Sequence, residues 1–447
     1  MSALVWFRRD LRLTDNPAWA TASADHDELE AIFVLDRRLL DAAGDARRDL
    51  LFANLRALDS ELRALGGSLT VVPGPADEAL PTVLGGHEAV YWNRDYTPFA
   101  IRRDNAVAAR ADVEVVTFDG DAVHAPGTVL TGSGTPYRVF TPYYRTWSAL
   151  PIEPWPQPGS ATVLGRTEAE IPAPNRPTIP PGEAGARNRL ERFLAVVDGY
   201  QDERNRPDLD RTSHLSADLK FGTISPRVVK ETVGTASEGR RTFVRQLAWR
   251  DFYAQVLYHS PHTVNAPLRE DLGSIIWEDD DEAAQAWRDG RTGYPIVDAG
   301  MRQLRTEGWM HNRVRMITAS FLVKDLGIDW RVGEGHFRRL LLDADVAQNV
   351  GNWQWVAGTG ADAAPYFRIM NPVTQSARFD PDGNYIRRHV PELSPLESPA
   401  VHAPWQYPVE SAAAGITLGD DYPYPLIDHA TARDLTLRRF EAAKGAD

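Results

Sequence analysis

Short apolar runs alternate with amphipathic stretches along the first 130 residues of the chain. Runs rich in β-branched and aromatic residues predict strands at residues 3–7, 29–36, 68–72, 89–94 and 113–118. Apolar residues at helical spacing predict helices between them, at residues 17–25, 46–65 and 98–111. Gly66 and Gly67 end the second helix. Strands that alternate with helices in this way predict a parallel sheet with helices on both faces.

The remainder of the chain has mostly helical periodicity. Apolar positions three and four apart predict helices at residues 187–197, 225–233, 241–259, 296–308, 310–324 and 336–345. Nine of the 32 prolines fall in residues 151–181, which predicts an extended segment without regular structure. The predicted fold class is α/β for residues 1–130, with a parallel, Rossmann-like sheet of five strands, a connector at residues 131–184, and an all-helical domain at residues 185–447.

Composition narrows the possible functions. The chain has 49 basic and 62 acidic residues and a formal net charge of −13, so any contact with nucleic acid must come from a local basic patch. It has no cysteine, which excludes disulfides and thiolate chemistry. The histidines show no metal-ligand spacing such as HExxH, and we expect no metal site. No signal segment follows Met1 and no apolar run approaches ~18 residues, so we expect a cytoplasmic protein that does not cross a membrane.

The first turn after a strand, FRRDLRLTDNP, lacks the GxGxxG pattern that lets a backbone approach a pyrophosphate. We therefore do not expect a main dinucleotide cofactor to bind the α/β domain in that way.

The stretch from Trp309 to Trp355 contains most of the candidate chemistry. Side chains three or four apart on a helix are neighbours, so one helix face is expected to carry Asn312, Arg315, Met316 and Ala319. An amide, a guanidinium and a thioether on one face are more than an ordinary core requires.

Two aspartates follow this helix. Asp343 is a natural partner for Arg315, and a helix through Asp345 would stack Asn349 above it. A purely structural ion pair is the alternative interpretation. The chain has 13 tryptophans, and their density in this stretch favours a functional site.

The segments TGYPIVDAGMRQL, GWMHNRVRMITASFLVKDLGIDW, LLDADVAQN and NWQWVAGTGADAAPYFRIMNPVTQSARFDPDGNYIRRHVPEL resemble the photolyase/cryptochrome flavoproteins, and so does VWFRRDLRLTDNPAW at the start. The most similar branch is the class I cyclobutane pyrimidine dimer photolyase. The resemblance implies a light-dependent repair enzyme that flips a dimer out of UV-damaged DNA, beside reduced anionic FAD, and splits it by photoinduced electron transfer.

The resemblance also assigns residues. Those implied for FAD are Tyr200, Thr212, Ser213, His214, Leu215, Ser216, Arg250, Asn312, Arg315, Asp343, Ala344, Asp345 and Asn349, with His214 standing where many relatives carry arginine. Those implied for DNA are Arg204, Gln246, Trp249, Tyr253, Asn312, Arg313, Met316, Trp355, Arg368 and Gln375. The electron relay from flavin to surface is implied for Trp353, Trp330 and Trp277, Asn349 is expected to face flavin N5, and Gln246 replaces a glutamate of most relatives.

The family also binds an antenna chromophore. The segment WNRDYTPF favours 8-hydroxy-5-deazaflavin over methenyltetrahydrofolate and places Asp95 in its site. We expect a monomer without an obligate protein partner. The alternatives are a cryptochrome, which senses blue light without repair, and a (6-4) photolyase. The presence of Trp249, Met316 and Trp355 and the lack of a long C-terminal extension favour repair over light sensing. Repair of the (6-4) photoproduct needs a catalytic histidine in the lesion pocket, and the only histidine of the central helix, His311, stands where the dimer-specific pattern also has one.

Overall fold

The computed structural model describes residues 2–165, 170–175, 177–363, 365 and 368–444. The chain divides into two compact units. The first comprises residues 1–198, 213–261 and 342–347, and the second comprises residues 199–212, 262–341 and 348–447. Each unit is thus assembled from segments that are distant in the sequence. The three-part division at residues 130 and 184 stays a prediction.

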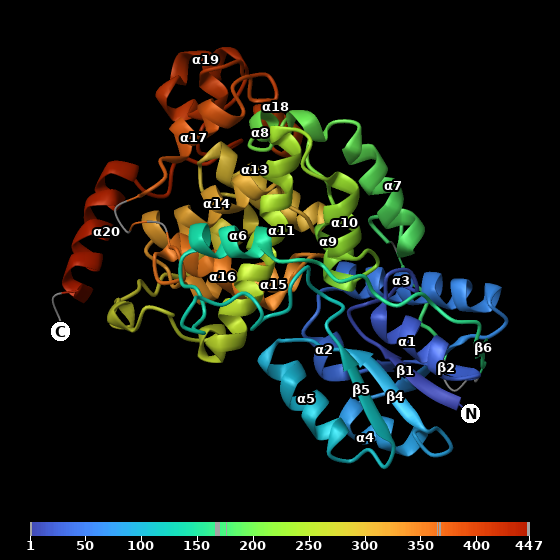
Figure 1. Ribbon diagram of the computed structural model, residues 1–447. Coiled ribbons are helices and arrows are strands. Elements are labelled where there is room, and N and C mark those ends of the chain that lie inside the picture. The colour runs from blue at the N-terminus through green and yellow to red at the C-terminus, as the bar shows by residue number, and fades with distance from the viewer. Residues whose placement is uncertain (1, 166–169, 176, 364, 366–367, 445–447) are drawn as a thin grey trace. The chain divides into compact units, whose positions relative to one another are not determined.

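The first unit contains a parallel sheet with the strand order β3-β2-β1-β4-β5 (Figure 1). Its strands are β1 (Ser2–Phe7), β2 (Glu28–Leu35), β3 (Leu69–Pro73), β4 (Ala89–Asn93) and β5 (Glu114–Phe118). The predicted α/β class and its five strands are confirmed. A two-residue strand, β6 (Thr162–Val163), pairs with the start of β2, so the proline-rich segment is not wholly without regular structure.

Side chains of β1 alternate between two apolar cores, one on each face of the sheet. Ala3, Val5 and Phe7 pack with the helices α1 (Pro17–Asp25) and α3 (Asp45–Ala64). Leu4 and Trp6 pack with α4 (Ala76–Val83) and α5 (Pro98–Ala108). A strand buried on both faces explains why the run ALVWF is apolar throughout rather than alternating.

The other α-helices of the first unit are α2 (Arg37–Asp41), α6 (Phe140–Ala149), α7 (Gly182–Leu194), α9 (Ser216–Phe221), α10 (Pro226–Val233) and α11 (Glu238–His259). Of these, α9 and α11 carry candidate site residues. The sequence pattern missed α2 and α4, because α2 has only five residues and α4 contains Pro81.

The described part of the second unit is helical. Its α-helices are α8 (Tyr200–Glu203), α12 (Asp281–Asp289), α13 (Pro295–Glu307), α14 (Asn312–Ser320), α15 (Trp330–Leu340), α17 (Pro372–Phe379), α18 (Asn384–His389), α19 (Pro408–Ala413) and α20 (His429–Lys444). Helix α16 (Val346–Ala357) starts in the last residues of the first unit and continues into the second. A π-helix, η4 (Phe321–Asp325), extends α14. The 3-10 helices η1 (Val197–Gly199) and η2 (Pro261–Val264) begin in the first unit and end in the second. The others, all in the second unit, are η3 (Glu270–Leu272), η5 (Pro391–Leu393), η6 (Ala400–His402) and η7 (Pro404–Gln406).

The helix expected at residues 336–345 is wrong in its second half. Helix α15 ends at Leu340, because Leu341 adopts an extended conformation with φ −67° and ψ 132°. The residues that follow form a connection to α16, so Asp345 precedes that helix instead of lying one turn below Asn349 inside it. The apolar run LLLDAD predicted a continuous helix. Its residues from Leu341 to Asp345 are instead buried in the connection between the two helices.

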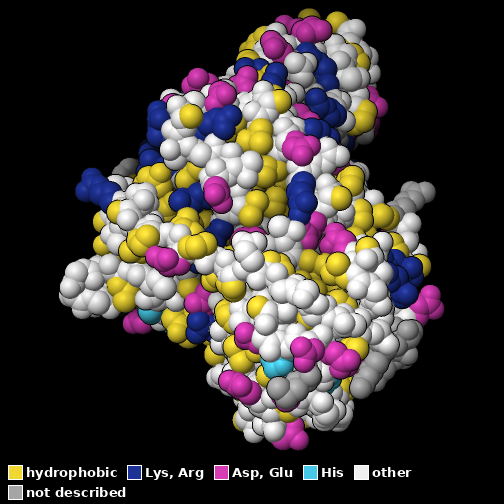
Figure 2. Space-filling view, turned by 45° about the vertical axis from the view of Figure 1, so that its right-hand side comes forward, with side chains coloured by type: hydrophobic (Ala, Val, Ile, Leu, Met, Phe, Trp, Pro, Cys, Tyr) yellow, Lys and Arg dark blue, Asp and Glu magenta, His cyan; other side chains and the backbone are white. Residues whose placement is uncertain are grey.

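On the face drawn in Figure 2, acidic and basic side chains are mixed over the upper part of the view, and acidic ones prevail at its lower end. None of the helices in the described ranges is long and apolar enough to cross a membrane. The described residues also contain no group of three or more histidine, aspartate or glutamate side chains arranged to hold a metal ion.

Candidate functional site

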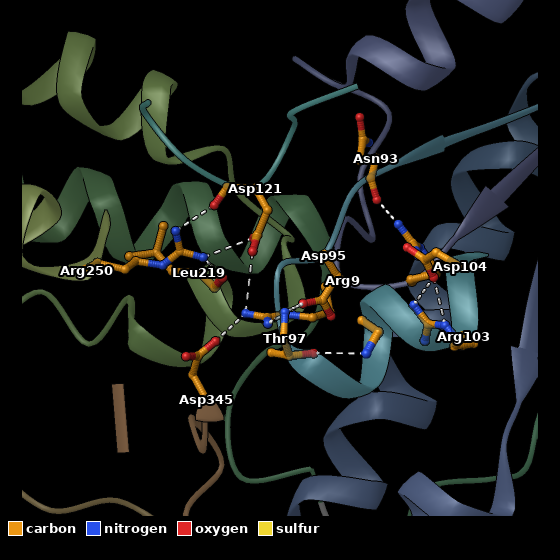
Figure 3. Close-up of polar contacts among 12 residues, drawn as sticks. Arg9, Asn93, Asp95, Thr97, Arg103, Asp104, Asp121, Leu219, Arg250 and Asp345 are labelled. Atoms are coloured by element: carbon orange, nitrogen blue, oxygen red, sulfur yellow. Dashed lines mark hydrogen bonds and ion pairs between the residues drawn. The ribbon is translucent and has the colours of Figure 1, made fainter. Parts of the chain in front are cut away.

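Arg9 lies at the centre of a buried charge cluster in the first unit (Figure 3). It follows β1, donates a hydrogen bond to Asp345, and lies 3.6 Å from Asp95 Oδ1 and 3.5 Å from Asp121 Oδ2. Arg250 of α11 shares Asp121, with 3.0 Å between Nη2 and Oδ1. Burial opposes the charge of Arg9, but the three carboxylates together raise its pKa above the ordinary value.

Asp95, the predicted antenna residue, belongs to this cluster. Its Oδ1 also accepts a hydrogen bond from the Thr97 backbone N–H at 3.0 Å, at the start of α5. Burial opposes ionisation of Asp95, yet Arg9 and Arg103 hold its pKa below the ordinary value. Asp95 therefore stays charged and has structural partners, and its antenna role stays a prediction.

Asp343, Ala344 and Asp345 form the buried connection between α15 and α16. In the second unit, Asn349 donates from Nδ2 to the carbonyl of Glu334 at 3.0 Å and to its Oε1 at 2.9 Å. Burial raises the pKa of Glu334. Because the donor nitrogen of Asn349 is occupied, its Oδ1 is the group left to accept from another N–H.

Helix α14 brings the predicted polar face together. His311 caps the helix by accepting from the Arg313 backbone N–H at 3.2 Å. Asn312 Nδ2 lies 3.7 Å from Met316 Sδ, so these two side chains are neighbours as the i, i+4 spacing predicted. Arg315 donates from Nε to the Met310 carbonyl at 2.8 Å. Its expected pairing with Asp343 stays a prediction.

Arginines gather in the second unit around Arg313. Its guanidinium lies 4.3 Å from the centre of the Phe379 ring and donates to Asn205 Oδ1 at 2.8 Å. Burial, together with the charges of Arg204 and Arg378, lowers the pKa of Arg313 to about 10. A guanidinium whose pKa falls through burial and like charge is suited to an anion.

Arg368 and Gln375, also predicted for DNA, lie in the same unit, and Gln375 is on α17. Arg368 is exposed and Gln375 is partly buried. Gln375 and Arg378 are three residues apart on α17, which places their side chains on neighbouring positions of one helix face.

Helix α11 carries the predicted lesion residues in the first unit. The Trp249 indole stacks on Phe140 of α6, with 3.7 Å between ring centres and 8° between planes, and lies 5.4 Å from Tyr253. Gln246 donates from Nε2 to the Thr242 carbonyl at 3.0 Å, one turn back along the helix. Its Oε1 can still accept a hydrogen bond, and the second N–H of Nε2 can still donate one.

The three predicted relay tryptophans all lie in the second unit. Trp330 and Trp353 are 1% and 2% exposed, and Trp353 packs edge-on against Phe337 with 5.0 Å between ring centres. Trp277 is partly exposed and packs against Phe440 at 6.4 Å. The Glu278 backbone N–H donates to the Gly327 carbonyl at 2.9 Å, which sets the segment of Trp277 beside the segment that leads into Trp330.

The hydroxyl-rich segment expected at the flavin phosphates divides between the units, with Tyr200 and Thr212 in the second and residues 213–216 in the first. The Thr212 hydroxyl is buried without a hydrogen-bond partner among the described residues. A buried, unpaired hydroxyl fits a polar ligand. Burial raises the pKa of Tyr200, and His214 adopts a left-handed conformation with φ 52°.

Leu215 and Ser216 are the capping residue and the first residue of α9. The Leu215 backbone N–H donates to Ser213 Oγ at 3.3 Å. Trp355 lies on α16, two residues beyond Trp353.

Comparison with known proteins identifies the family. The family model described as "DNA photolyase" matches residues 3–159, and the one described as "FAD binding domain of DNA photolyase" matches residues 243–442. The chain belongs to the DNA photolyase family. The predicted resemblance is thereby confirmed, and the photolyase chain contains the FAD-binding domain of its family.

Individual photolyases are similar over the whole length of the chain. The deoxyribodipyrimidine photo-lyase of Agrobacterium fabrum is 40% identical, over 99% of this chain and 98% of the relative. The crystal structure of a bacterial class III photolyase from Agrobacterium tumefaciens has a TM-score of 0.93 and 38% identity, covering 99% of this chain and 98% of that one. A Synechocystis cryptochrome structure has a TM-score of 0.89 and 28% identity, covering 98% of each chain. Because the similar structure from Agrobacterium tumefaciens is a class III photolyase, the predicted class I assignment stays a prediction.

Several residues with clear structural roles were missed in the sequence. Arg9 and Asp121 complete the charge cluster, Phe140 stacks on Trp249, and Arg378 joins the arginine group. Arg378 had a detectable signal, because it lies three residues from Gln375. The others had none, because each meets its partners through contacts between distant segments.

Proposed function

We propose that this photolyase repairs cyclobutane pyrimidine dimers in DNA by light-dependent electron transfer. The observation that carries the proposal is the arginine group around Arg313, with Arg204 and Arg378 beside it, in a chain whose net charge is −13. Local positive charge on an acidic protein supports a specific binding site for DNA phosphates rather than general nucleic-acid binding.

The residues proposed to hold FAD are those assigned by the resemblance, from Tyr200 to Asn349. The buried Thr212 hydroxyl supports this assignment, because a polar ligand would supply the hydrogen bond that it lacks among the described residues. When bound, the reduced anionic flavin supplies an electron to the dimer under blue light. The protein's part is to hold and orient the cofactor and to exclude water from it. Asn349 offers its Oδ1, since its Nδ2 donates to Glu334.

The dimer must leave the base stack to reach a flavin, and photolyases are among the enzymes that extrude their target base from the duplex. Following the resemblance, we assign Trp249, Tyr253, Met316 and Trp355 to contacts with the extruded dimer. Stacking on an aromatic side chain contributes ~1–3 kcal/mol per base. Phe140 supports the assignment of Trp249, because it stacks on one face of the indole and holds the plane of the ring. We assign Gln246 Oε1 to accept from a pyrimidine N–H, while one of the two N–H groups of its Nε2 donates to the Thr242 carbonyl.

We assign electron supply from the surface to Trp353, Trp330 and Trp277. Two of these indoles are buried and the third is partly exposed, which supports the assignment because a relay that ends at the surface needs one exposed member. For the antenna we propose 8-hydroxy-5-deazaflavin near Asp95. A monomeric state and a cytoplasmic location are also proposed.

The decisive experiment uses the purified full chain loaded with FAD and chemically reduced. Under blue light it should restore intact pyrimidines in an oligonucleotide that carries a cyclobutane dimer, and in darkness it should not. Absence of conversion by enzyme with bound, reduced FAD would overturn the proposal. Conversion of a (6-4) photoproduct instead would reassign the substrate, and bound FAD with no repair of either lesion would favour a cryptochrome.

The relay is tested separately with Trp353→Phe. Oxidised variant enzyme should photoreduce far more slowly than wild type, whereas chemically reduced variant should repair at a near-normal rate, because the relay loads the electron without contacting the lesion. Equal loss of both activities would contradict the relay assignment.

A further inference from the structure

We propose that Arg9 is a positioning residue of the flavin site. It holds the Asp345 carboxylate in place and neutralises its charge, and it thereby favours the anionic reduced state of the flavin. The inference rests on the proposed function, which assigns Asp345 to FAD. Arg9 itself belongs to the turn after β1 and is assigned neither to FAD nor to DNA.

The first support is the geometry of the pair. Arg9 donates from Nη2 to Asp345 Oδ2, although the two residues are 336 positions apart in the sequence. Their side chains are 18% and 10% exposed, so the contact is largely shielded from water. A guanidinium has a fixed planar fork of donors, and a carboxylate bound to it loses most of its freedom to rotate.

The second support is that Arg9 is itself fixed from other directions. It lies 3.6 Å from Asp95 and 3.5 Å from Asp121, which come from the segments after β4 and after β5 (Figure 3). Arg250 holds Asp121 in turn, with 3.0 Å between Nη2 and Oδ1. Arg9 is therefore anchored to the carboxyl edge of the sheet and presents a rigid donor to Asp345.

The charges of the cluster explain the effect on the flavin. Asp95, Asp121 and Asp345 are partnered by Arg9 and Arg250. Lys220 also faces Asp345 and Asp95, and Arg103 faces Asp95. Without Arg9, Asp345 would lose the guanidinium that it accepts a hydrogen bond from, and the net charge of the cluster would become more negative by one unit. Like charges repel strongly in a poorly solvated site, so the cluster would then disfavour an anionic flavin.

The experiment measures the midpoint potential of bound FAD by its absorption spectrum during a reductive titration. Two neutral variants are compared with wild type: Arg9→Met, and Arg9→Gln, which keeps an N–H donor for Asp345. At a fixed solution potential we expect the ratio of reduced to oxidised flavin to fall about tenfold in both variants. This is the order of effect that one uncompensated charge has inside a protein. The matched control is Arg94→Met, which removes an arginine of the same unit that pairs with Asp119. It should leave the ratio unchanged.

A double variant shows whether Arg9 acts through Asp345. If it does, Arg9→Met should change the ratio little in an Asp345→Asn background. An equal shift in both backgrounds would mean that Arg9 acts directly and would overturn the inference, as would no shift in either. Loss of folding in Arg9→Met, seen as a lost thermal transition, leaves the test to Arg9→Gln. Failure of the wild type to bind FAD would contradict the proposed function, whereas wild type that binds FAD and repairs, with unchanged Arg9 variants, would contradict this inference alone.

Discussion

Gly333 is the position at which α15 comes closest to the relay tryptophan Trp353. A Cβ at residue 333 would lie 2.1 Å from Trp353 Cη2, 2.5 Å from its Cζ3 and 2.6 Å from Leu322 Cδ2. Carbon atoms do not approach this closely, and both neighbours are buried. Gly333→Ala should therefore push the indole or the helix aside. Overpacking of this kind destabilises a protein by ~1–3 kcal/mol. Replacing glycine by alanine inside a helix stabilises it by ~0.5–1 kcal/mol, which offsets part of that cost.

The net expectation is a fall of about 1–2 kcal/mol in the free energy of unfolding, measured by denaturant titration. The matched control is Gly335→Ala in the same helix, where an added Cβ meets no atom within 4 Å. It should stabilise the protein by ~0.5–1 kcal/mol, because alanine is the better helix former.

Photoreduction supplies the second measurement. Since Gly333 lies one turn beyond Trp330, displacement of Trp353 from α15 should also slow photoreduction of oxidised FAD in Gly333→Ala and leave it unchanged in Gly335→Ala. Equal stability of the two variants, with equal photoreduction, would refute the close packing of Trp353 on α15.

Three further predictions concern the lesion, the DNA and a buried lysine. Gln246→Ala should lower the repair yield and weaken binding of dimer-containing DNA by ~1–3 kcal/mol, because a lesion N–H loses its acceptor. Gln246→Glu should give an equal or higher yield. Unchanged binding and repair by the alanine variant would show that this side chain does not contact the lesion. Arg313→Ala should reduce the slope of log affinity against log salt concentration by ~1, and an unchanged slope would mean that its guanidinium does not meet a phosphate. Burial lowers the pKa of Lys324 to about 7, so between that pH and its ordinary value the unfolded chain binds a proton that the folded chain lacks, and the free energy of unfolding should rise with pH across this window. Lys324→Met should be more stable than wild type near pH 7 and lose that part of the pH dependence; the same pH dependence in both proteins would contradict the lowered pKa.

The sequence by itself determined the elements and their class. Continuous apolar runs between helical stretches predicted the five parallel strands, and the spacing of Asn312 and Met316 placed them correctly on one face of α14. These signals are local, because helix and strand periods repeat every few residues. Long shared motifs also identified the family, which the matches at residues 3–159 and 243–442 confirmed.

Tertiary structure decided which distant segments meet. Periodicity marks a side chain as buried without naming its neighbour, so nothing in the turn after β1 predicted that Arg9 would reach Asp345. The same holds for Phe140, which lies far before Trp249 in the sequence and yet stacks on its ring. The connection from Leu341 to Asp345 was taken for helix because apolar residues are buried in loops as well as in helices. Pairing of this kind depends on the closure of long loops around a common core, and that information lies in the packed chain as a whole.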